Sequence, residues 1–441
     1  MTRVAVASAA GTTIEYYDFF IYGTAAALVF PAVFFPALGA AAGTIASFAT
    51  FAVAFLARPL GAVVFGHYGD KLGRKKTLVS TLTIMGVSTV LIGLLPSAST
   101  IGVLAPILLI ILRFGQGLAV GGEWAGAVLL AAEYAPARRR GLYAAFPQMG
   151  PAFAFALSCA TFLATNLTLG DQSEAFISYG WRIPFLLSGV LLVIGLYIRL
   201  KIAETPVFAS EMKAAQQADN APRKLPVLEV LARQPKEVVL AGGSLVMLFA
   251  FFYIGTAFLT SYGTSRSGLG LDRPTVLALG LVGSVSFAAG ALISGWVSDH
   301  WGRRRVVLGA CVAGVPWSLG LFPLLHIGTP LAFGIGISGT LLILAVAYGP
   351  AGSHLPELFE TRYRYTGAGM AYNLAGVLGG GITPIVAATL LTSAGGFAIG
   401  LLLAGTSVLS VVCTLALRET KGNDLADVAE LARVEKAAVR A

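Results

Sequence analysis

Long apolar segments recur along the whole chain and are separated by short polar stretches. A helix that crosses a bilayer needs about 20 apolar residues, and these segments are about that long or longer. Their recurrence predicts an all-α polytopic membrane protein with twelve transmembrane helices in two six-helix halves. The predicted helices span residues 11–37, 44–66, 77–95, 102–132, 142–165, 182–200, 237–263, 274–297, 306–327, 330–355, 366–392 and 396–417.

A longer polar stretch divides the twelve predicted helices into two sets of six. Residues 201–236 carry several prolines, mixed charges and an Ala/Gln-rich centre, which is typical of a linker. We therefore expect an N-terminal six-helix bundle at 1–200, a cytoplasmic linker at 201–236, a C-terminal six-helix bundle at 237–418 and a cytoplasmic tail at 419–441.

The composition agrees with a membrane protein and excludes several other classes. Only 12% of the residues are charged and 56% are hydrophobic, whereas a soluble domain carries about 25% charged residues. A soluble enzyme, a nucleic-acid-binding domain and a disordered protein are therefore excluded. Cys159, Cys311 and Cys413 stand singly in apolar segments, so we expect neither a disulfide framework nor a metal site.

Positive charge is concentrated in the loops on one side of the predicted bundle. The chain has 30 Lys and Arg residues and a net charge of +9, and most of these residues fall on the side that also holds both termini. The positive-inside rule makes that side cytoplasmic, so we expect a multi-pass protein of the cytoplasmic (inner) membrane. The charge faces anionic headgroups, so membrane lipid is an expected partner and nucleic acid is not.

A loop motif occurs once in each half. It reads GHYGDKLGRKK from Gly66 and GWVSDHWGRRR from Gly295. A second pair of loops, at residues 133–141 and 356–367, has nearly the same offset between its copies. Two matched pairs predict a duplicated six-helix unit with the substrate site between the halves, near the membrane midplane.

The paired loops have the composition of a gating latch. Glycine lets two helix ends approach closely, and an Asp followed by an Arg can lock helix ends through charge-assisted hydrogen bonds. A simple positively charged anchor is the alternative. We assign the gating role to Gly66, Asp70, Gly73, Arg74, Glu133, Arg140, Asp299, Arg303, Glu357 and Arg362.

Five further stretches of the chain carry a family resemblance. They are EYYDFFIYG at 15–23, FLARPLG at 55–61, RFGQGLAVGGEW at 113–124, ETPVF at 204–208, and YTG at 365–367 running on to GGGITP at 379–384. With these stretches the chain resembles the major facilitator superfamily, and within it the metabolite:H+ symporter family, over essentially its whole length.

The resemblance implies a major facilitator fold and a proton-coupled symporter that imports a small organic acid by alternating access. A shikimate-like acid and H+ are the implied partners, and no cofactor and no metal is implied. Other family substrates (2-oxoglutarate, citrate, proline and betaine) stay open, as does a proton-independent facilitator or antiporter. A nutrient receptor that binds without transport is the alternative from another class, and the short tail argues against it.

A few charged residues lie inside the predicted helices, all in the first half. A charge at this depth costs about 2.5–3.5 kcal/mol on insertion scales, so each is a functional candidate. Glu15 and Asp18 are three residues apart on one helix face, and two close carboxylates resist ionising together, which suits reversible protonation. Arg113 can pair with Asp18. By resemblance we assign proton coupling to Asp18, Glu15 and Arg113, with a static buried pair as the alternative.

Arg58 and Glu123 lie at similar depth in neighbouring predicted helices. Equal depth permits a salt bridge, so we predict a buried charge pair whose role is either structural or functional. No nucleophile–base or metal cluster lies in the helices, so no enzyme and no catalytic residue is expected.

The second half offers neutral hydrogen-bonding groups opposite this charged wall. A neutral wall facing a charged one suits a small hydroxylated or zwitterionic anion. An amide inside a helix needs a partner, which makes Asn373 the strongest of these groups. The substrate-binding candidates are Tyr22, Arg113, Gln148, Tyr253, Thr256, Tyr348, Tyr372 and Asn373.

Overall fold

The computed structural model describes residues 2–72, 74–121, 128, 131, 135–170, 173–201, 226–360 and 364–422, and these residues form helices joined by short turns. The helices of the first half are α1 (Thr2–Leu28), α2 (Phe30–Phe34), α3 (Gly39–Leu72), α4 (Arg74–Leu94), α5 (Ala98–Ile101), α6 (Leu104–Val120), α8 (Arg140–Leu169), α9 (Glu174–Ser178) and α10 (Ile183–Lys201), with short 3-10 turns η1 (Pro36–Leu38), η2 (Ala137–Arg139) and η3 (Gly180–Arg182).

The second half begins after the predicted linker. Its elements are α12 (Pro226–Arg233), α13 (Pro235–Ser244), α14 (Val246–Tyr253), η4 (Ile254–Phe258), α15 (Leu259–Thr264), α16 (Arg273–Trp301), α17 (Arg303–Leu325), α18 (Pro330–Leu358), α19 (Arg364–Ala375), η5 (Gly376–Ile382), α20 (Thr383–Ser393) and α21 (Gly395–Ala416).

The predicted all-α membrane fold is confirmed. Among the described residues, nine helices are long and apolar enough to cross a membrane, and α4 and α6 carry shorter apolar stretches. Together with α1 they supply the twelve predicted spans. The first span differs from the prediction: α1 ends at Leu28, and α2 and η1 begin anew at Phe30 and Pro36 because prolines occupy their first turns.

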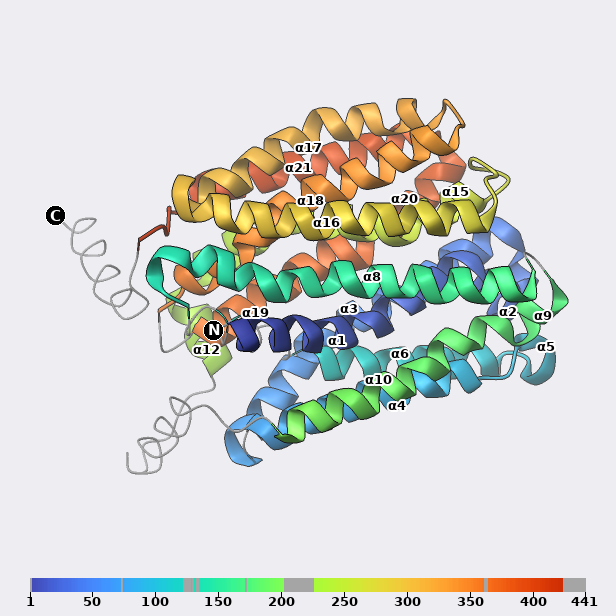
Figure 1. Cartoon of the computed structure of the whole chain (residues 1–441), viewed down its shortest axis with the longest axis horizontal. Helices are drawn as coiled ribbons and strands as arrows, with labels where there is room; N and C mark the ends of the chain where they lie inside the picture. The colour runs from blue at the N-terminus through green and yellow to red at the C-terminus, as the bar shows by residue number, and fades with distance from the viewer. Residues whose placement is uncertain are drawn as a thin grey trace.

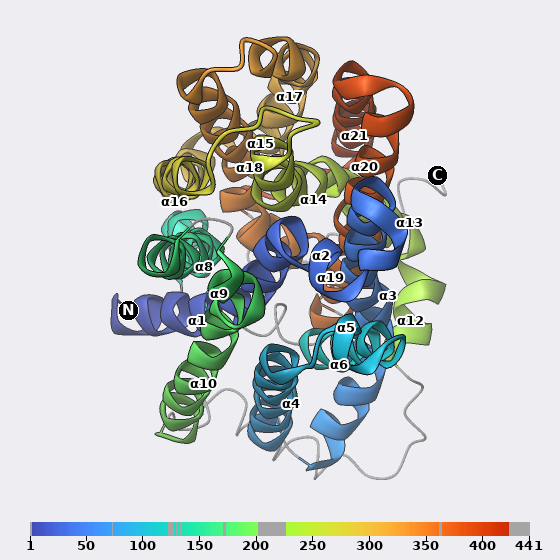
Figure 2. The ribbon, with the colours of Figure 1, turned by 90° about the vertical axis from the view of Figure 1, so that its right-hand side faces the viewer.

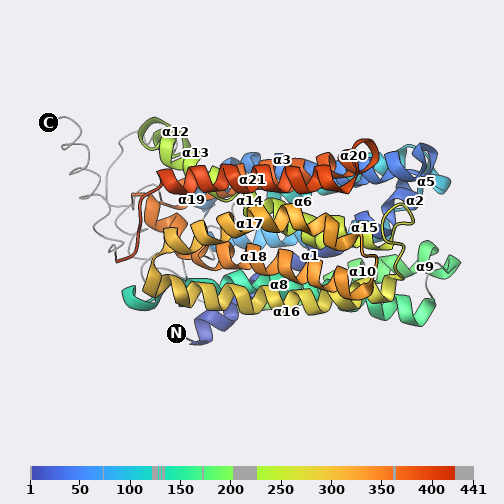
Figure 3. The same ribbon diagram turned by 90° about the horizontal axis from the view of Figure 1, so that it is seen from above.

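The long helices run parallel to the longest axis of the molecule (Figure 1). Seen along that axis, the helices of the second half lie on one side and those of the first half on the other, with α8 packed against α16 where they meet (Figure 2). The start of α1 and the end of α21 lie at the same end of the bundle, and the short helices α2, α5 and α9 lie at the opposite end (Figure 3). We call these the terminal end and the distal end.

Large apolar side chains cover the outside of the bundle. Leu56, Ile111, Val193, Val285 and Val412 are exposed on different helices. An apolar surface spread over so many helices is tolerated in lipid and not in water. By contrast, every residue of α14 is buried, because this helix packs against η5, α18 and α21 of its own half and against rings of the first half.

Glycines set the distance between α3 and α6. A Cβ on Gly117 would overlap the carbonyl oxygen of Ala54 and lie 2.6 Å from its Cα, and a Cβ on Gly121 would overlap the carbonyl oxygen of Arg58. Gly117 and Gly121, four residues apart on one face of α6, therefore bring the backbones of α6 and α3 into contact. This contact holds Arg58 beside the end of α6.

Two π-helical turns interrupt the second half, η4 on the α13–α15 helix and η5 on the α19–α20 helix. Both contact the first half, η4 against α1 and η5 against α3. In η5, a Cβ on Gly380 would lie 2.9 Å from the ring of Phe55 and one on Gly381 would lie 3.3 Å from its Cβ. π-turns of this kind occur often at functional sites, and these two are in the helices that face the other half.

Substituting Gly117→Ala is expected to destabilise the folded protein by about 1–3 kcal/mol, because the added methyl group has no space between α6 and α3. Thermal unfolding of the purified protein in detergent measures the effect. Gly405→Ala is the matched control, since a Cβ there meets no atom within 4 Å. Equal unfolding temperatures for the two variants would contradict the close packing of α3 and α6.

Candidate functional site

Asp18 lies on α1 inside the first half and is buried. Its Oδ2 accepts a hydrogen bond of 2.7 Å from the Thr89 hydroxyl on α4, and its Oδ1 accepts one from the Ser188 hydroxyl on α10. One carboxylate therefore ties α1 to two neighbouring helices, with both oxygens satisfied. Glu15, the other acid predicted to take part in proton coupling, is buried one turn earlier on α1.

Hydrogen bonds continue from Asp18 to Arg113 on α6. Gln116 Nε2 donates to Thr89 Oγ1 at 2.6 Å, and Arg113 Nη1 donates to Gln116 Oε1 at 2.9 Å. All four side chains are buried. The predicted direct pair between Asp18 and Arg113 is not formed among the described residues. Two neutral side chains connect the acid to the base instead.

Aromatic rings surround the Arg113 guanidinium and explain why it does not reach Asp18. Its Cζ lies 4.6 Å from the ring centroid of Phe19, 4.0 Å from that of Tyr22 and 4.7 Å from that of Phe51. Such contacts attract a desolvated cation by about 2 kcal/mol or more. Within the described residues, Nε and Nη2 have no hydrogen-bond partner, so the rings and Gln116 hold the charge.

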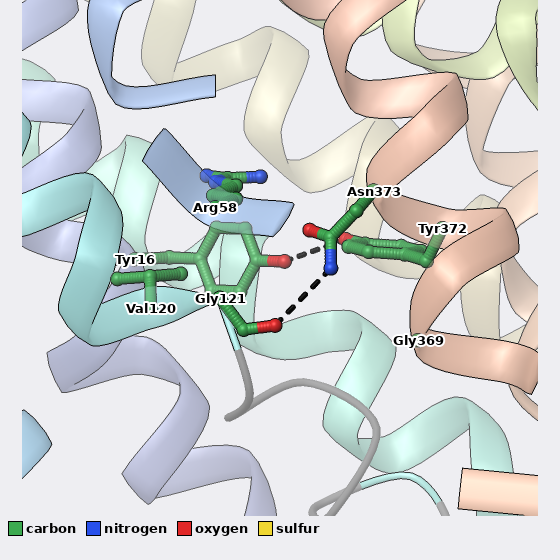
Figure 4. Close-up of a pocket in the computed structure, with 7 residues that line it drawn as sticks. All are labelled: Tyr16, Arg58, Val120, Gly121, Gly369, Tyr372 and Asn373. Carbon is green, nitrogen blue, oxygen red and sulfur yellow. Dashed lines mark hydrogen bonds between the residues drawn. The ribbon is translucent and has the colours of Figure 1, made fainter. Parts of the chain in front are cut away.

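Arg58 on α3 lines a small cavity between the two halves (Figure 4). Its guanidinium lies over the rings of Phe19 and Phe55, with Cζ 4.6 and 4.3 Å from their centroids. The cavity volume is about 10 Å³, which admits about one water molecule. It is lined by Tyr16, Arg58, Val120, Gly121, Gly369, Tyr372 and Asn373. Glu123, the predicted partner of Arg58, lies outside the described residues.

A cluster of tyrosine hydroxyls joins the halves beside this cavity. The hydroxyls of Tyr16 and Tyr372 share a hydrogen bond of 2.6 Å, and those of Tyr348 and Tyr372 share one of 3.2 Å. Gln148 Nε2 donates to the Tyr348 carbonyl oxygen at 3.1 Å, and Asn373 Nδ2 donates to that of Gly121 at 3.1 Å. Four predicted substrate candidates (Gln148, Tyr348, Tyr372 and Asn373) therefore lie at one interface.

The other predicted substrate contacts are placed differently. The Tyr22 hydroxyl is 2.6 Å from that of Thr50, and the Thr256 hydroxyl donates to the carbonyl oxygen of Phe252 in its own helix at 2.6 Å. Both groups are therefore occupied within the first half or within one helix. The ring of Tyr253 packs on Phe51 and Phe55 across the interface, and Arg113 is enclosed as described above.

At the terminal end, Asp299 joins the two halves. Its Oδ1 accepts from the backbone N–H of Gly141 at 2.8 Å, and its Oδ2 accepts from that of Leu142 at 2.9 Å. These groups belong to the first turn of α8, where N–H groups have no partner inside the helix and the helix dipole favours a negative charge. An acid of the second half therefore caps a helix of the first.

Glu357 at the end of α18 takes part in the same contact between the halves. Its Oε1 is 3.3 Å from Arg140 Nη1 of the first half, and its Oε2 is 3.4 Å from Arg303 Nε. Arg303 Nη2 in turn lies 3.0 Å from Asp299 Oδ1. The four side chains form one buried ion-pair cluster, which we call the latch cluster (Arg140, Asp299, Arg303 and Glu357).

The segment after α21 packs against the latch cluster. The Thr420 hydroxyl donates to Glu357 Oε2 at 2.6 Å, and the backbone N–H of Arg303 donates to Glu419 Oε1 at 2.8 Å. Burial favours the neutral form of Glu419, but the backbone N–H groups of Lys421 and Arg303 outweigh it and hold the pKa of this carboxyl below its ordinary value. Glu419 therefore acts as an ionised acceptor.

The first-half copy of the predicted latch is only partly described. Gly66 and Asp70 lie on α3, and Arg74 begins α4, but the side chains of Asp70 and Arg74 fall outside the described part of the chain. Gly73, Glu133 and Arg362 also lie outside it. The gating assignment of all ten residues, including those of the ion-pair cluster, stays a prediction.

Comparison with known proteins identifies the family. The family model described as the Major Facilitator Superfamily matches residues 9–382, which is most of the chain. The chain belongs to the major facilitator superfamily. This major facilitator protein is therefore a multi-pass membrane transporter of small molecules and not an enzyme.

Relatives of known name support this assignment over nearly the full length. The chain is 44% identical over 427 residues to the inner membrane metabolite transport protein YhjE of Escherichia coli (strain K12), covering 96% of this chain and 95% of the relative. It is 39% identical over 427 residues to the shikimate transporter of the same organism, covering 95% of each chain. The crystal structure of a D-xylose-proton symporter superimposes with a TM-score of 0.70 at 17% identity, covering 95% of this chain and 98% of that one.

Four functional candidates in this transporter escaped prediction from the sequence. Thr89 and Ser188 are single hydroxyl residues in apolar helices, where such side chains usually bond to their own backbone, so nothing in the sequence marks them. Gln116 carried a usable signal, because it lies three residues after Arg113 and therefore on the same helix face. Tyr16 stands between the two predicted acids, and its partner Tyr372 was predicted.

Substituting Asp299→Asn is expected to weaken closure of the terminal end. The amide lacks the charge and one acceptor oxygen, and hydrogen bonds to charged groups contribute about 1.5–3 kcal/mol each. The population open at this end should therefore rise by about tenfold or more. Distances between spin labels at positions 139 and 305, one in each half, measure that population. Asp272→Asn, at the start of α16, is the control and should leave the distances unchanged. An unaltered distribution for Asp299→Asn would contradict the latch.

Proposed function

We propose that this transporter is a proton-coupled symporter that imports a small hydroxylated organic acid across the inner membrane by alternating access. The observation that carries the proposal is the hydrogen-bonded chain of Asp18, Thr89, Gln116 and Arg113. It connects an acid that can take up a proton to a cation in the same half. A shikimate transporter that is 39% identical to this chain supports the substrate, and a D-xylose-proton symporter of the same fold supports the coupling ion.

Thr89 allows Asp18 to hold a proton without losing its hydrogen bond. Thr89 Oγ1 lies 2.7 Å from Asp18 Oδ2 and 3.0 Å from the carbonyl oxygen of Met85 on its own helix. When Asp18 is ionised, the hydroxyl donates to the carboxylate. When Oδ2 carries a proton, the hydroxyl turns to Met85 and accepts from Asp18. Both protonation states are then satisfied in a place where an unpaired polar group is costly.

Protonation of Asp18 also removes the negative charge that balances Arg113. The two charges communicate through neutral amide and hydroxyl groups, so the proton changes the electrostatic field at Arg113 without breaking a salt bridge. In a region of low dielectric constant this change is large. The rings around Arg113 belong to α1 and α3. The change in the electrostatic field therefore acts on helices that face the second half.

Contacts at both ends of the bundle fit an occluded step of alternating access. The latch cluster closes the terminal end. At the distal end, Arg273 Nη2 of the second half donates to the Leu28 carbonyl oxygen at 3.4 Å. We place the terminal end and both chain termini in the cytoplasm, as the distribution of Lys and Arg predicts. Transport then alternates by opening one of these two ends at a time.

Asp18→Asn is expected to abolish proton-driven accumulation while sparing exchange. The amide cannot take up a proton, yet it retains the shape of the acid. Proteoliposomes with an imposed pH gradient should show an accumulation ratio near one, while counterflow of labelled substrate continues. Asp272→Asn is the control and should accumulate substrate normally. Full accumulation by Asp18→Asn would reject proton coupling at this residue. Failure of the unaltered protein to alkalinise the medium when substrate is added would favour a facilitator.

Thr89→Val and Thr89→Ser form a matched pair that tests the hydrogen-bonded chain from Asp18 to Arg113. Valine keeps the branched shape and removes the hydroxyl, so Asp18 loses a partner in both protonation states and Gln116 loses its acceptor. We expect Val to reduce proton-driven accumulation by at least about tenfold and to shift its pH profile, whereas Ser should retain both. Counterflow reports on folding and substrate binding in each variant. A Val variant with an unchanged pH profile would show that the chain plays no part in coupling.

A further inference from the structure

Arg58 differs from Asp18 and Arg113 because its charge faces the space between the halves. It is 2% exposed, and its Nε has no hydrogen-bond partner among the described residues. A Cβ on Gly376 of η5 would lie 3.8 Å from Arg58 Nη1, so the guanidinium of the first half reaches the π-turn of the second. It borders the cavity that Figure 4 shows.

Asn373 presents an acceptor on the opposite wall of the same cavity. Its Nδ2 donates to the Gly121 carbonyl oxygen at 3.1 Å, and this bond fixes which way the amide points. The amide oxygen is therefore on the side of Arg58 (Figure 4), where no described residue donates to it. The hydroxyl pair of Tyr16 and Tyr372 lies beside it.

We propose that Arg58 and Asn373 form the substrate subsite and that its ligand is a hydroxylated carboxylate. The carboxylate of the ligand binds the guanidinium, and a ligand hydroxyl donates to Asn373 Oδ1. The proposal rests on the proposed function and names its substrate class. The residues that line the cavity supply one cation, one amide and two phenols. Such a lining suits an anion with hydroxyl groups, and none of the described residues in it offers a carboxylate to a quaternary ammonium group.

Two further features of the cavity fit a ligand that enters and leaves the site. The cavity admits about one water molecule in the closed form, so a ligand requires the halves to separate. The bond between Asn373 and Gly121 joins the second half to the first and breaks in that motion. Gly121 and Gly369 leave the walls without side chains, and the adjoining π-turn η5 is a natural place for α19 to shift.

The assignment separates the roles of the two buried arginines. Arg113 is enclosed by three rings and by Gln116 and does not line the cavity. Arg58 has rings on its flanks and lines the cavity. Arg113 therefore belongs to the hydrogen-bonded chain of Asp18, and Arg58 contacts the substrate.

Matched ligands test the subsite on the full-length protein in detergent. Shikimate, its methyl ester and cyclohex-1-ene-1-carboxylate differ by the charge or by the hydroxyl groups. Their affinities are measured by calorimetry, with malate and quinate included as further hydroxy acids. The unaltered protein should bind shikimate at least about tenfold more tightly than either analogue, since a site built for a polar group rejects the ligand that lacks it. If none of the hydroxy acids binds, the proposal is rejected.

Two substitutions then locate the discrimination. Arg58→Met should remove the preference for the acid over the ester while leaving ester affinity nearly unchanged. Asn373→Leu should remove the preference for shikimate over the deoxy acid. If Arg58→Met does not yield folded protein, Arg58→Lys replaces it. Lysine keeps the charge but loses the planar fork that matches a carboxylate, so the preference should fall several-fold. Retention of the acid-to-ester ratio in either Arg58 variant would overturn the proposal.

The same variants distinguish a failure of this subsite from a failure of proton coupling. Asp18→Asn should bind shikimate with the same ratio of acid to ester affinity as the unaltered protein. If the ratio depends on Arg58 but substrate moves no protons, the coupling fails and the subsite stands. If protons move with substrate and the ratio is independent of Arg58, the coupling stands and the subsite fails.

Discussion

A charge that is removed from water must find its partners within the protein, and this constraint organises the first half of the transporter. Asp18 is held by two hydroxyls, and Arg113 by an amide and three aromatic rings. These partners come from α1, α3, α4, α6 and α10, so the groups that stabilise the charges also fasten five helices together. Arg58 draws on the same rings through Phe19. The cost of burying charge therefore keeps the helices of this half packed together.

The second half is held together by different means. Glycines bring its helices into contact with their neighbours, and a Cβ on Gly379 would lie 2.8 Å from Phe249 Cβ. In the middle of the molecule the halves meet through aromatic rings and through hydrogen bonds of Tyr16, Tyr372 and Asn373, while ions and backbone groups join them at the terminal end. Bonds at that end can exchange their partners for water when they break. The rings need no such partner, whereas the central hydroxyls and the amide must bind water or a ligand when the halves separate.

The number of helices could be predicted from the sequence because hydropathy is a property of each segment alone. The two halves could be predicted because a polar linker and repeated loop motifs mark them. The buried acids and arginines were equally visible, because charges are rare at that depth. The hydrogen-bond partners of these charged groups could not be predicted. Thr89 has an acceptor in its own helix as well as in Asp18, so its type gives no sign of a partner on another helix. The expected ion pair of Asp18 with Arg113 was wrong. The prediction paired opposite charges and did not consider aromatic rings as partners of a buried cation.

Phe19 is the residue through which the proton site and the cavity meet. It follows Asp18 directly on α1, and its ring centroid lies 4.6 Å from the guanidinium carbon of Arg113 and 4.6 Å from that of Arg58. Any displacement of α1 that accompanies protonation of Asp18 therefore moves a ring that contacts both cations. Coupling between proton and substrate needs an element whose position both ligands influence. Under the proposed mechanism that element is the turn of α1 that carries Asp18 and Phe19, and no contact between the proton and the substrate is required.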